Sequence, residues 1–162
     1  MDVQIAVAKR SDLPALVTLA VQFRDDLKQR EPSCDNFTHS FRTLLADSGT
    51  EFFIAHTGVG EPIGYIQCRY RYSAWTSGWD AELEDVFVSA SARRKGFGRQ
   101  LVEFAVSRAI EKKCRLIGLN TNEQNEAAFN LYCSLGFRAE REVWRGGRQL
   151  WLEKQLTRAN GS

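Results

Sequence analysis

Hydrophobic and polar residues follow two patterns along the chain, one typical of strands and the other of helices. Short apolar or alternating runs between turn residues predict strands, and apolar residues at helical spacing predict amphipathic helices. Strands are predicted at residues 3–8, 51–57, 63–73, 83–88, 116–121, 139–144 and 148–155. Helices are predicted at residues 11–29, 36–47, 99–110 and 126–135.

The order of these elements, β-α-α-β-β-β-α-β-α-β-β, predicts the fold class. It suits an α+β protein of three layers, in which a mixed sheet carries helices on both faces. The last two strands flank residues 145–147, Arg-Gly-Gly, which is a hairpin signal. A chain of 162 residues is long enough to bury one sizeable core. We therefore expect one domain over residues 1–156 and a disordered tail over residues 157–162.

The segment from residue 82 to residue 102 contains the most informative chemistry. An apolar strand that includes Glu84 and Asp85 leads into a basic loop with two glycines, Gly96 and Gly98, and then directly into a helix. Helix N-termini bind phosphate through free N–H groups, and glycine lets the backbone approach a ligand closely. The basic residues of the loop, which supply counter-charge, are Arg93, Arg94, Lys95 and Arg99. The spacing of the glycines excludes a P-loop and a dinucleotide fingerprint.

This loop resembles the acetyl-CoA pyrophosphate loop of the GNAT superfamily of N-acetyltransferases, Arg/Gln-x-x-Gly-x-Gly/Ala. Arg93, Gly96 and Gly98 fill its fixed positions. A second segment, residues 125–137, is similar to the family's Asn-x-x-Ala-x-x-x-Tyr-x-x-x-Gly-Phe segment at every fixed position. The resemblance implies a mostly antiparallel central sheet, acetyl-CoA as cosubstrate and no metal. The residues it implies for cofactor binding are Val86, Phe87, Val88, Arg93, Arg94, Lys95, Gly96, Phe97, Gly98, Arg99, Asn120, Asn125, Ala128 and Tyr132.

Acetyl transfer to an amine needs a base for the ammonium proton and an acid for the departing thiolate. Glu84 is the candidate base, because apolar neighbours on its strand are expected to desolvate it and raise its pKa. Its Leu-Glu-Asp context also resembles that of polyamine and aminoglycoside acetyltransferases. Strand neighbours point to opposite faces, so Glu84 and Asp85 are not expected to share one, whereas Glu82 shares the face of Glu84. Tyr132, at the position of the family's tyrosine, is the candidate acid.

Each catalytic candidate has a structural alternative. Glu84 serves equally well as the partner of a basic neighbour, and Tyr132 as a packed ring with its hydroxyl bonded elsewhere. Asp25 and Asp26 are weak candidates for substrate binding, because the resemblance places their region at the acceptor wall. Trp75 and Trp79 are expected to pack rather than to stack on a ligand.

Composition narrows the class of partner. The net charge of +2 favours neither nucleic acid nor a membrane surface. The chain has no apolar run of membrane-spanning length and no signal-peptide pattern at its start. Its four cysteines lie in periodic segments without Cys-x-x-Cys spacing, which predicts buried side chains in a reducing, cytoplasmic compartment. Two histidines provide little material for a metal site or a Ser–His triad.

The functional hypothesis is an acetyl-CoA-dependent N-acetyltransferase that acts on a primary amine of a small cationic molecule or a peptide. A homodimer is possible. The alternative is a catalytically silent acyl-CoA-binding regulatory module on the same fold. Nucleic-acid binding through residues 93–99 lacks supporting aromatic or basic surroundings.

Overall fold

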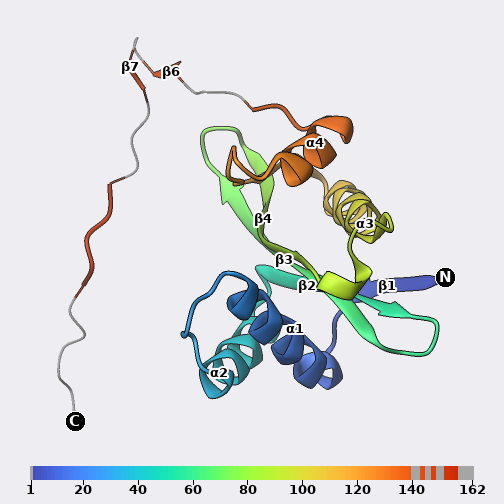
Figure 1. The fold of residues 1–162 in the computed structure, drawn as a ribbon. Coiled ribbons are helices and arrows are strands. Elements are labelled where there is room, and N and C mark those ends of the chain that lie inside the picture. Colours follow the sequence, from blue (N-terminus) through green and yellow to red (C-terminus); the bar gives the residue numbers. More distant parts are fainter. Residues whose placement is uncertain (1, 140–142, 145–146, 149–151, 157–162) are drawn as a thin grey trace.

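The computed structural model describes residues 2–139, 143–144, 147–148 and 152–156 (Figure 1). Its helices and strands follow the predicted order, with a single 3₁₀ turn added before α1 and before α3. The strands are β1 (Val3–Val7), β2 (Thr50–Thr57), β3 (Pro62–Ser73), β4 (Gly78–Val88), β5 (Cys114–Leu119), β6 (Val143–Trp144) and β7 (Gly147–Arg148). The helices are α1 (Leu13–Asp26), α2 (Cys34–Leu45), α3 (Phe97–Glu111) and α4 (Glu126–Ser134).

The five longer strands form one sheet in the order β1-β2-β3-β4-β5. The first three pairings are antiparallel, and β4 pairs with β5 in parallel. This parallel pairing follows from the connection through α3, because a crossover of this length returns the chain to the same end of the sheet. The expectation of a mixed, mostly antiparallel sheet is confirmed.

Two hydrophobic clusters cover the two faces of this sheet. One is formed by α1 and α2 against Phe52, Tyr65 and Phe87, and the other by α3 against the opposite face. Figure 1 shows the pair α1 and α2 on one side of the sheet and α3 with α4 on the other. The three-layer arrangement follows from alternation, since successive strand residues point to opposite faces and most of β2 and β3 is buried on both.

Several element boundaries differ from the predictions. α1 ends at Asp26, before the predicted residue 29, and β4 begins at Gly78, before the predicted residue 83. The predicted terminal hairpin exists, but β6 and β7 have two residues each. Residues 152–155, predicted as strand, are not in a strand. The predicted tail, residues 157–162, lies outside the described residues.

The packing predicted for the two tryptophans and the burial predicted for the cysteines are each found only in part. Trp75 is fully exposed at the tip of the β3–β4 hairpin, and Trp79 is about half exposed and makes an edge-to-face contact with Tyr72. Their sequence position cannot reveal this, because no element covers the end of this hairpin among the described residues. Of the cysteines, only Cys68 is buried, whereas Cys34 and Cys133 are exposed.

Candidate active site

β5, an edge strand of the sheet, ends before its neighbour β4 does. Their pairing ends at Leu83 and Leu119, whereas β4 continues to Val88 and remains paired with β3 on its other edge. Over the last five residues of β4, the edge that faces β5 therefore has no strand partner among the described residues. Such an edge presents backbone N–H and C=O groups that an extended ligand can pair with as an added strand.

A β-bulge lies just beyond the last residue of β4 that pairs with β5. Gln67 pairs with Asp85 and Cys68 with Leu83, so Glu84 is the extra residue of β4. Because a bulge places two residues opposite one, it shifts the alternation of side chains by one position. Glu84 contacts Gln67 and Asp85 contacts Tyr65, and these two partners lie on the same face of β3.

Glu84 and Asp85 therefore point to the same face of the sheet, the one that α1 and α2 cover further along. The expectation that they point to opposite faces was wrong, because it assumed a regular strand. Glu82 also lies on this face, as expected, where it pairs with Arg71 at 3.5 Å.

Arg69 and Gln67 hold the Glu84 carboxylate. Nε of Arg69 lies 2.8 Å from Oε1, a second guanidinium nitrogen donates to Oε2 at 3.2 Å, and the Gln67 amide donates to the same oxygen. Glu84 is thus ion-paired and partly accessible rather than desolvated by its strand neighbours. The anticipated pairing with a basic neighbour is present, and it orients the carboxylate toward the open face.

The desolvated carboxylate of this strand is Asp85. Burial raises its pKa, the hydroxyl of Tyr65 opposes this with a hydrogen bond of 3.1 Å, and the charge of Glu84 raises the pKa further. Asp85 and Tyr65 lie at a cavity of about 190 Å³ beneath α1, together with Phe23 and Phe37. The site thus contains two adjacent carboxylates, one accessible and ion-paired and the other buried.

The glycine loop lies directly beyond the end of β4. Gly96 has a φ of +82°, which is the left-handed region that favours glycine, and a Cβ at this position would meet nothing within 4 Å. α3 begins at the next residue, so its unpaired N–H groups lie at this loop. Open space beside a helix N-terminus fits the phosphate cradle expected from the sequence.

Three of the four basic side chains of the loop contact other residues of the chain. Arg93 donates to the Val88 carbonyl at 2.9 Å, pairs with Asp26 and lies over the ring of Phe87. Lys95 donates to the Ser91 carbonyl at 2.8 Å, and Arg99 to the Ser134 hydroxyl at 2.6 Å. These contacts hold the loop against β4, α1 and α4.

The weak substrate candidates Asp25 and Asp26 are both ion-paired. Asp26 pairs with Arg93, and Asp25 with Arg24 at 2.7 Å. Asp26 therefore joins α1 to the glycine loop, and neither carboxylate lines a cavity described here.

α4 carries the second motif. The Asn125 side chain accepts a hydrogen bond from the Ala128 N–H at 3.2 Å and caps the helix, and Gly136, with a φ of +89°, ends it. Tyr132 is buried, with its ring edge-to-face against Phe137. Burial raises the pKa of Tyr132, and its hydroxyl has no hydrogen-bond partner among the described residues.

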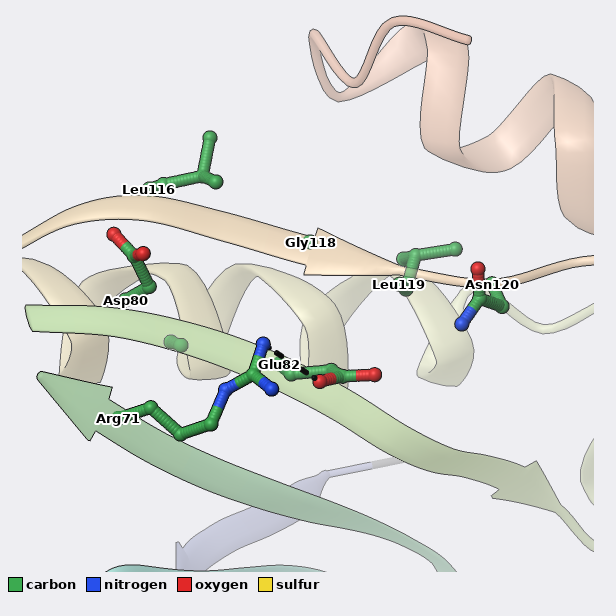
Figure 2. Close-up of a pocket in the computed structure, with 8 residues that line it drawn as sticks. Arg71, Asp80, Glu82, Leu116, Gly118, Leu119 and Asn120 are labelled. Carbon is green, nitrogen blue, oxygen red and sulfur yellow. Dashed lines mark ion pairs between the residues drawn. The ribbon is translucent and has the colours of Figure 1, made fainter. Parts of the chain in front are cut away.

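Asn120 lines two cavities near the end of β5. The larger, about 860 Å³, lies between β5 and α4 and includes Tyr132. The smaller, about 220 Å³, lies on the face of Glu82 and is lined by Arg71, Asp80 and Gly118 among others (Figure 2). Asp80 and Gly118 were not among the site residues predicted from the sequence. The period-two spacing of Asp80, Glu82 and Glu84 is the signal that connects them.

Within the described ranges, no helix is long and apolar enough to cross a membrane. The same ranges contain no group of three or more His, Cys, Asp or Glu side chains that would hold a metal ion.

Comparison with known proteins identifies the family. The model of the Acetyltransferase (GNAT) family matches residues 17–137. A thialysine N-epsilon-acetyltransferase of Sus scrofa is 33% identical over 137 residues, which is 76% of this chain and 80% of that protein. An uncharacterized N-acetyltransferase of Methanocaldococcus jannaschii is 29% identical over 69% of this chain, and the match spans about half of its length, 47%.

Solved structures agree on the fold. An aminoglycoside N-acetyltransferase in complex with CoA superimposes with a TM-score of 0.78 at 22% identity, over 96% of each chain. The strands β4 and β5, the glycine loop and the tyrosine-bearing helix all lie within the matched residues. The chain therefore belongs to the GNAT acetyltransferase family and is an acetyl-CoA-dependent N-acetyltransferase.

Proposed function

We propose that the chain transfers the acetyl group of acetyl-CoA to a primary amine of a small cationic molecule or a peptide, with Glu84 as base and Tyr132 as acid. The observation that carries this proposal is the position of Glu84, which shares its face of the sheet with Glu82 and lies just beyond the last residue of β4 that pairs with β5. Acetyl-CoA supplies the activated acetyl thioester. Every other requirement falls to side chains and backbone of this chain.

Binding of acetyl-CoA is assigned to the free edge of β4 and to the start of α3. The backbone of Val86, Phe87 and Val88 offers strand-like hydrogen bonds to an extended amide chain, because this edge has no strand partner in the described part of the chain. The loop from Arg93 to Arg99 offers helix N–H groups and basic charge to phosphates. Asn120, Asn125 and Ala128 complete the assigned set on the side of α4.

Glu84 is assigned the ammonium proton of the acceptor. An aliphatic ammonium is not nucleophilic, so a base must remove its proton directly or through water. Arg69 and Gln67 fix the carboxylate in place, which lowers the entropic cost of presenting it to the amine. Glu82, on the same face, is assigned to acceptor binding.

Tyr132 is assigned the proton for the departing thiolate. Its raised pKa keeps the phenol protonated throughout the neutral range, and its hydroxyl has no partner among the described residues. A phenol without a competing acceptor is free to donate to sulfur.

The substitution Glu84→Gln tests the proposal. It keeps the shape and one acceptor for Arg69 but removes basicity, so we expect kcat/KM at neutral pH to fall by about 10²- to 10⁴-fold. The acidic limb of the pH–rate profile should disappear, and higher pH should partly restore the rate. Thiol release with a panel of amines measures all of these.

Two comparisons make the result specific. Glu61→Gln, an exposed glutamate in the β2–β3 turn, should leave the rate unchanged. Full activity and an unaltered profile in Glu84→Gln, with both lost in Glu82→Gln, would transfer the role of base to Glu82. Absence of turnover with every amine in the unmodified protein would contradict the proposed function.

A further inference from the structure

The small cavity on the face of Glu82 lies outside the part of the site assigned to proton transfer. It has a volume of about 220 Å³ and lies over the first half of β4 and the neighbouring stretch of β5. Figure 2 shows Arg71 reaching from β3 across β4, so that its guanidinium group lies beside the carboxylate of Glu82. Gly118 of β5 and Asn120, just beyond the end of that strand, lie on the other side.

The two Arg–Glu ion pairs on this face differ in the distance between their charged groups. Arg69 and Glu84 approach to 2.8 Å and share further hydrogen bonds. Arg71 and Glu82 are 3.5 Å apart, and the Arg71 side chain is 70% exposed. Because loose, exposed ion pairs contribute little to stability, a ligand can insert between these two groups at low cost.

One hydrogen-bond acceptor that lines the cavity has no hydrogen-bond donor among the described residues. Oδ1 of Asp80 is buried and has no hydrogen bond with any described residue, and its ion pair with Arg115 is 3.9 Å long. Buried carboxylate oxygens are normally hydrogen-bonded, so this atom favours a ligand that brings N–H donors. The cavity thus offers a guanidinium fork for an anion and two carboxylates, Glu82 and Asp80, for a cation.

Gly118 keeps the floor of the cavity open. It lies opposite Glu82 in the parallel pairing, and a Cβ at this position would meet nothing within 4 Å. A side chain there would project into the cavity without a clash with the protein. Glycine has no advantage for strand stability, so its effect here is to leave room beside Glu82.

We propose that this cavity binds the ammonium and carboxylate groups of a free diamino acid, whose terminal amine is the one acetylated at Glu84. Arg71 matches a carboxylate in bidentate fashion, and Glu82 with Asp80 matches an ammonium group. Alternate strand residues are about 7 Å apart, a distance that the extended side chain of a lysine-like amino acid spans. A free amino acid presents both charges, whereas a diamine lacks the carboxylate and a lysine within a peptide lacks both.

This inference rests on the proposed function and is tested with three acceptors of equal reach: lysine, 1,5-diaminopentane and Nα-acetyl-lysine amide. We expect kcat/KM for lysine to exceed that for the other two by about 10- to 100-fold, the value of charge-assisted hydrogen bonds. Arg71→Gln should remove this preference by lowering kcat/KM for lysine and leaving that for 1,5-diaminopentane nearly unchanged. Arg42→Gln, an exposed arginine on α2, is the matched control.

Gly118→Val supplies a second variant that fills the cavity from the other side. It should raise KM for lysine and leave acetyl-CoA affinity, measured by calorimetry, unchanged. An Arg71→Gln enzyme that keeps its preference for lysine, or that loses activity equally with lysine and diamine, overturns the inference. So does a preference of the unmodified protein for the diamine or the lysine amide. A protein that acetylates no amine instead overturns the proposed function itself.

Discussion

Tyr132 is a buried side chain to which we assign the role of proton donor. Its ring is packed against Phe137, and its hydroxyl has no partner in the described part of the chain. If the phenol protonates the departing thiolate, Tyr132→Phe removes only that proton, so we expect kcat to fall by about 10²-fold with acetyl-CoA affinity nearly intact. Steady-state kinetics and calorimetry measure the two quantities. Normal turnover in the variant would reduce Tyr132 to a packing role.

The buried carboxylate of Asp85 is expected to lower the free energy of unfolding at neutral pH. Its pKa is raised, chiefly by burial, so folding favours the protonated form. This contribution to stability is fully present below the ordinary pKa of 3.8 and is lost as pH rises through the folded value. Asp85→Asn, which keeps an acceptor for Tyr65, should therefore raise the denaturation midpoint at pH 7.

The gain from Asp85→Asn should shrink as pH falls toward 3, and denaturant unfolding at several pH values measures it. Tyr65→Phe is the control that removes the hydrogen bond and leaves the carboxylate. A destabilised Asp85→Asn at neutral pH would mean that the ionised carboxylate makes a net favourable interaction.

At the scale of elements, an ion cluster joins α3 to the sheet. Glu51 on β2 binds Arg108 at 2.8 Å and Lys112 at 3.3 Å, and it accepts a hydrogen bond from the Tyr70 hydroxyl at 2.9 Å. Burial tends to raise the pKa of Glu51, but the Arg108 and Tyr70 hydrogen bonds and the charge of Lys112 lower it overall. A lowered pKa contributes stability at neutral pH that is lost as pH falls through the folded value.

Glu51→Gln should therefore destabilise the protein by about 1–3 kcal/mol at pH 7, the range for hydrogen bonds to charged groups. The difference from the unmodified protein should close at acid pH, which chemical unfolding at pH 7 and pH 3 measures. Glu111→Gln, which removes an exposed i,i+3 pair with Arg108, should cost less than about 0.5 kcal/mol. Equal losses in the two variants would contradict a special role for the cluster.

At the scale of the whole molecule, the proposed cosubstrate site lies where β4, α3 and α4 converge. A Cβ at Gly98 would lie 3.7 Å from Leu131 of α4 and 3.8 Å from Val88 of β4. A ligand held here bridges elements from distant parts of the chain, so it stabilises the native state by mass action. At 100 times its dissociation constant, acetyl-CoA should raise Tm by about 5–10 °C.

Thermal unfolding with and without acetyl-CoA measures this shift. Gly98→Val, whose larger side chain would crowd the start of α3, should lose most of it while keeping the far-UV spectrum of a folded protein. Gly96 is less suitable, because its positive φ strains any substitution. An unchanged shift in folded Gly98→Val would place acetyl-CoA elsewhere.

Much of the molecule follows from local sequence chemistry alone. The order of elements and the glycine loop before α3 were both predicted. Each depends on periodicity or on one residue's own backbone preference, and neither requires knowledge of a distant partner. The family resemblance rested on the same short segments.

What the sequence left open depended on pairing between strands and on packing over long separations. The bulge in β4 arises from its register with β3, and only this register turns Glu84 and Asp85 to one face. The contact of Arg93 with Asp26 spans 67 residues, and the looseness of Arg71 and Glu82 depends on neighbours from three strands. Desolvation is likewise a property of the assembled layers, which is why Asp85 rather than Glu84 became the buried carboxylate.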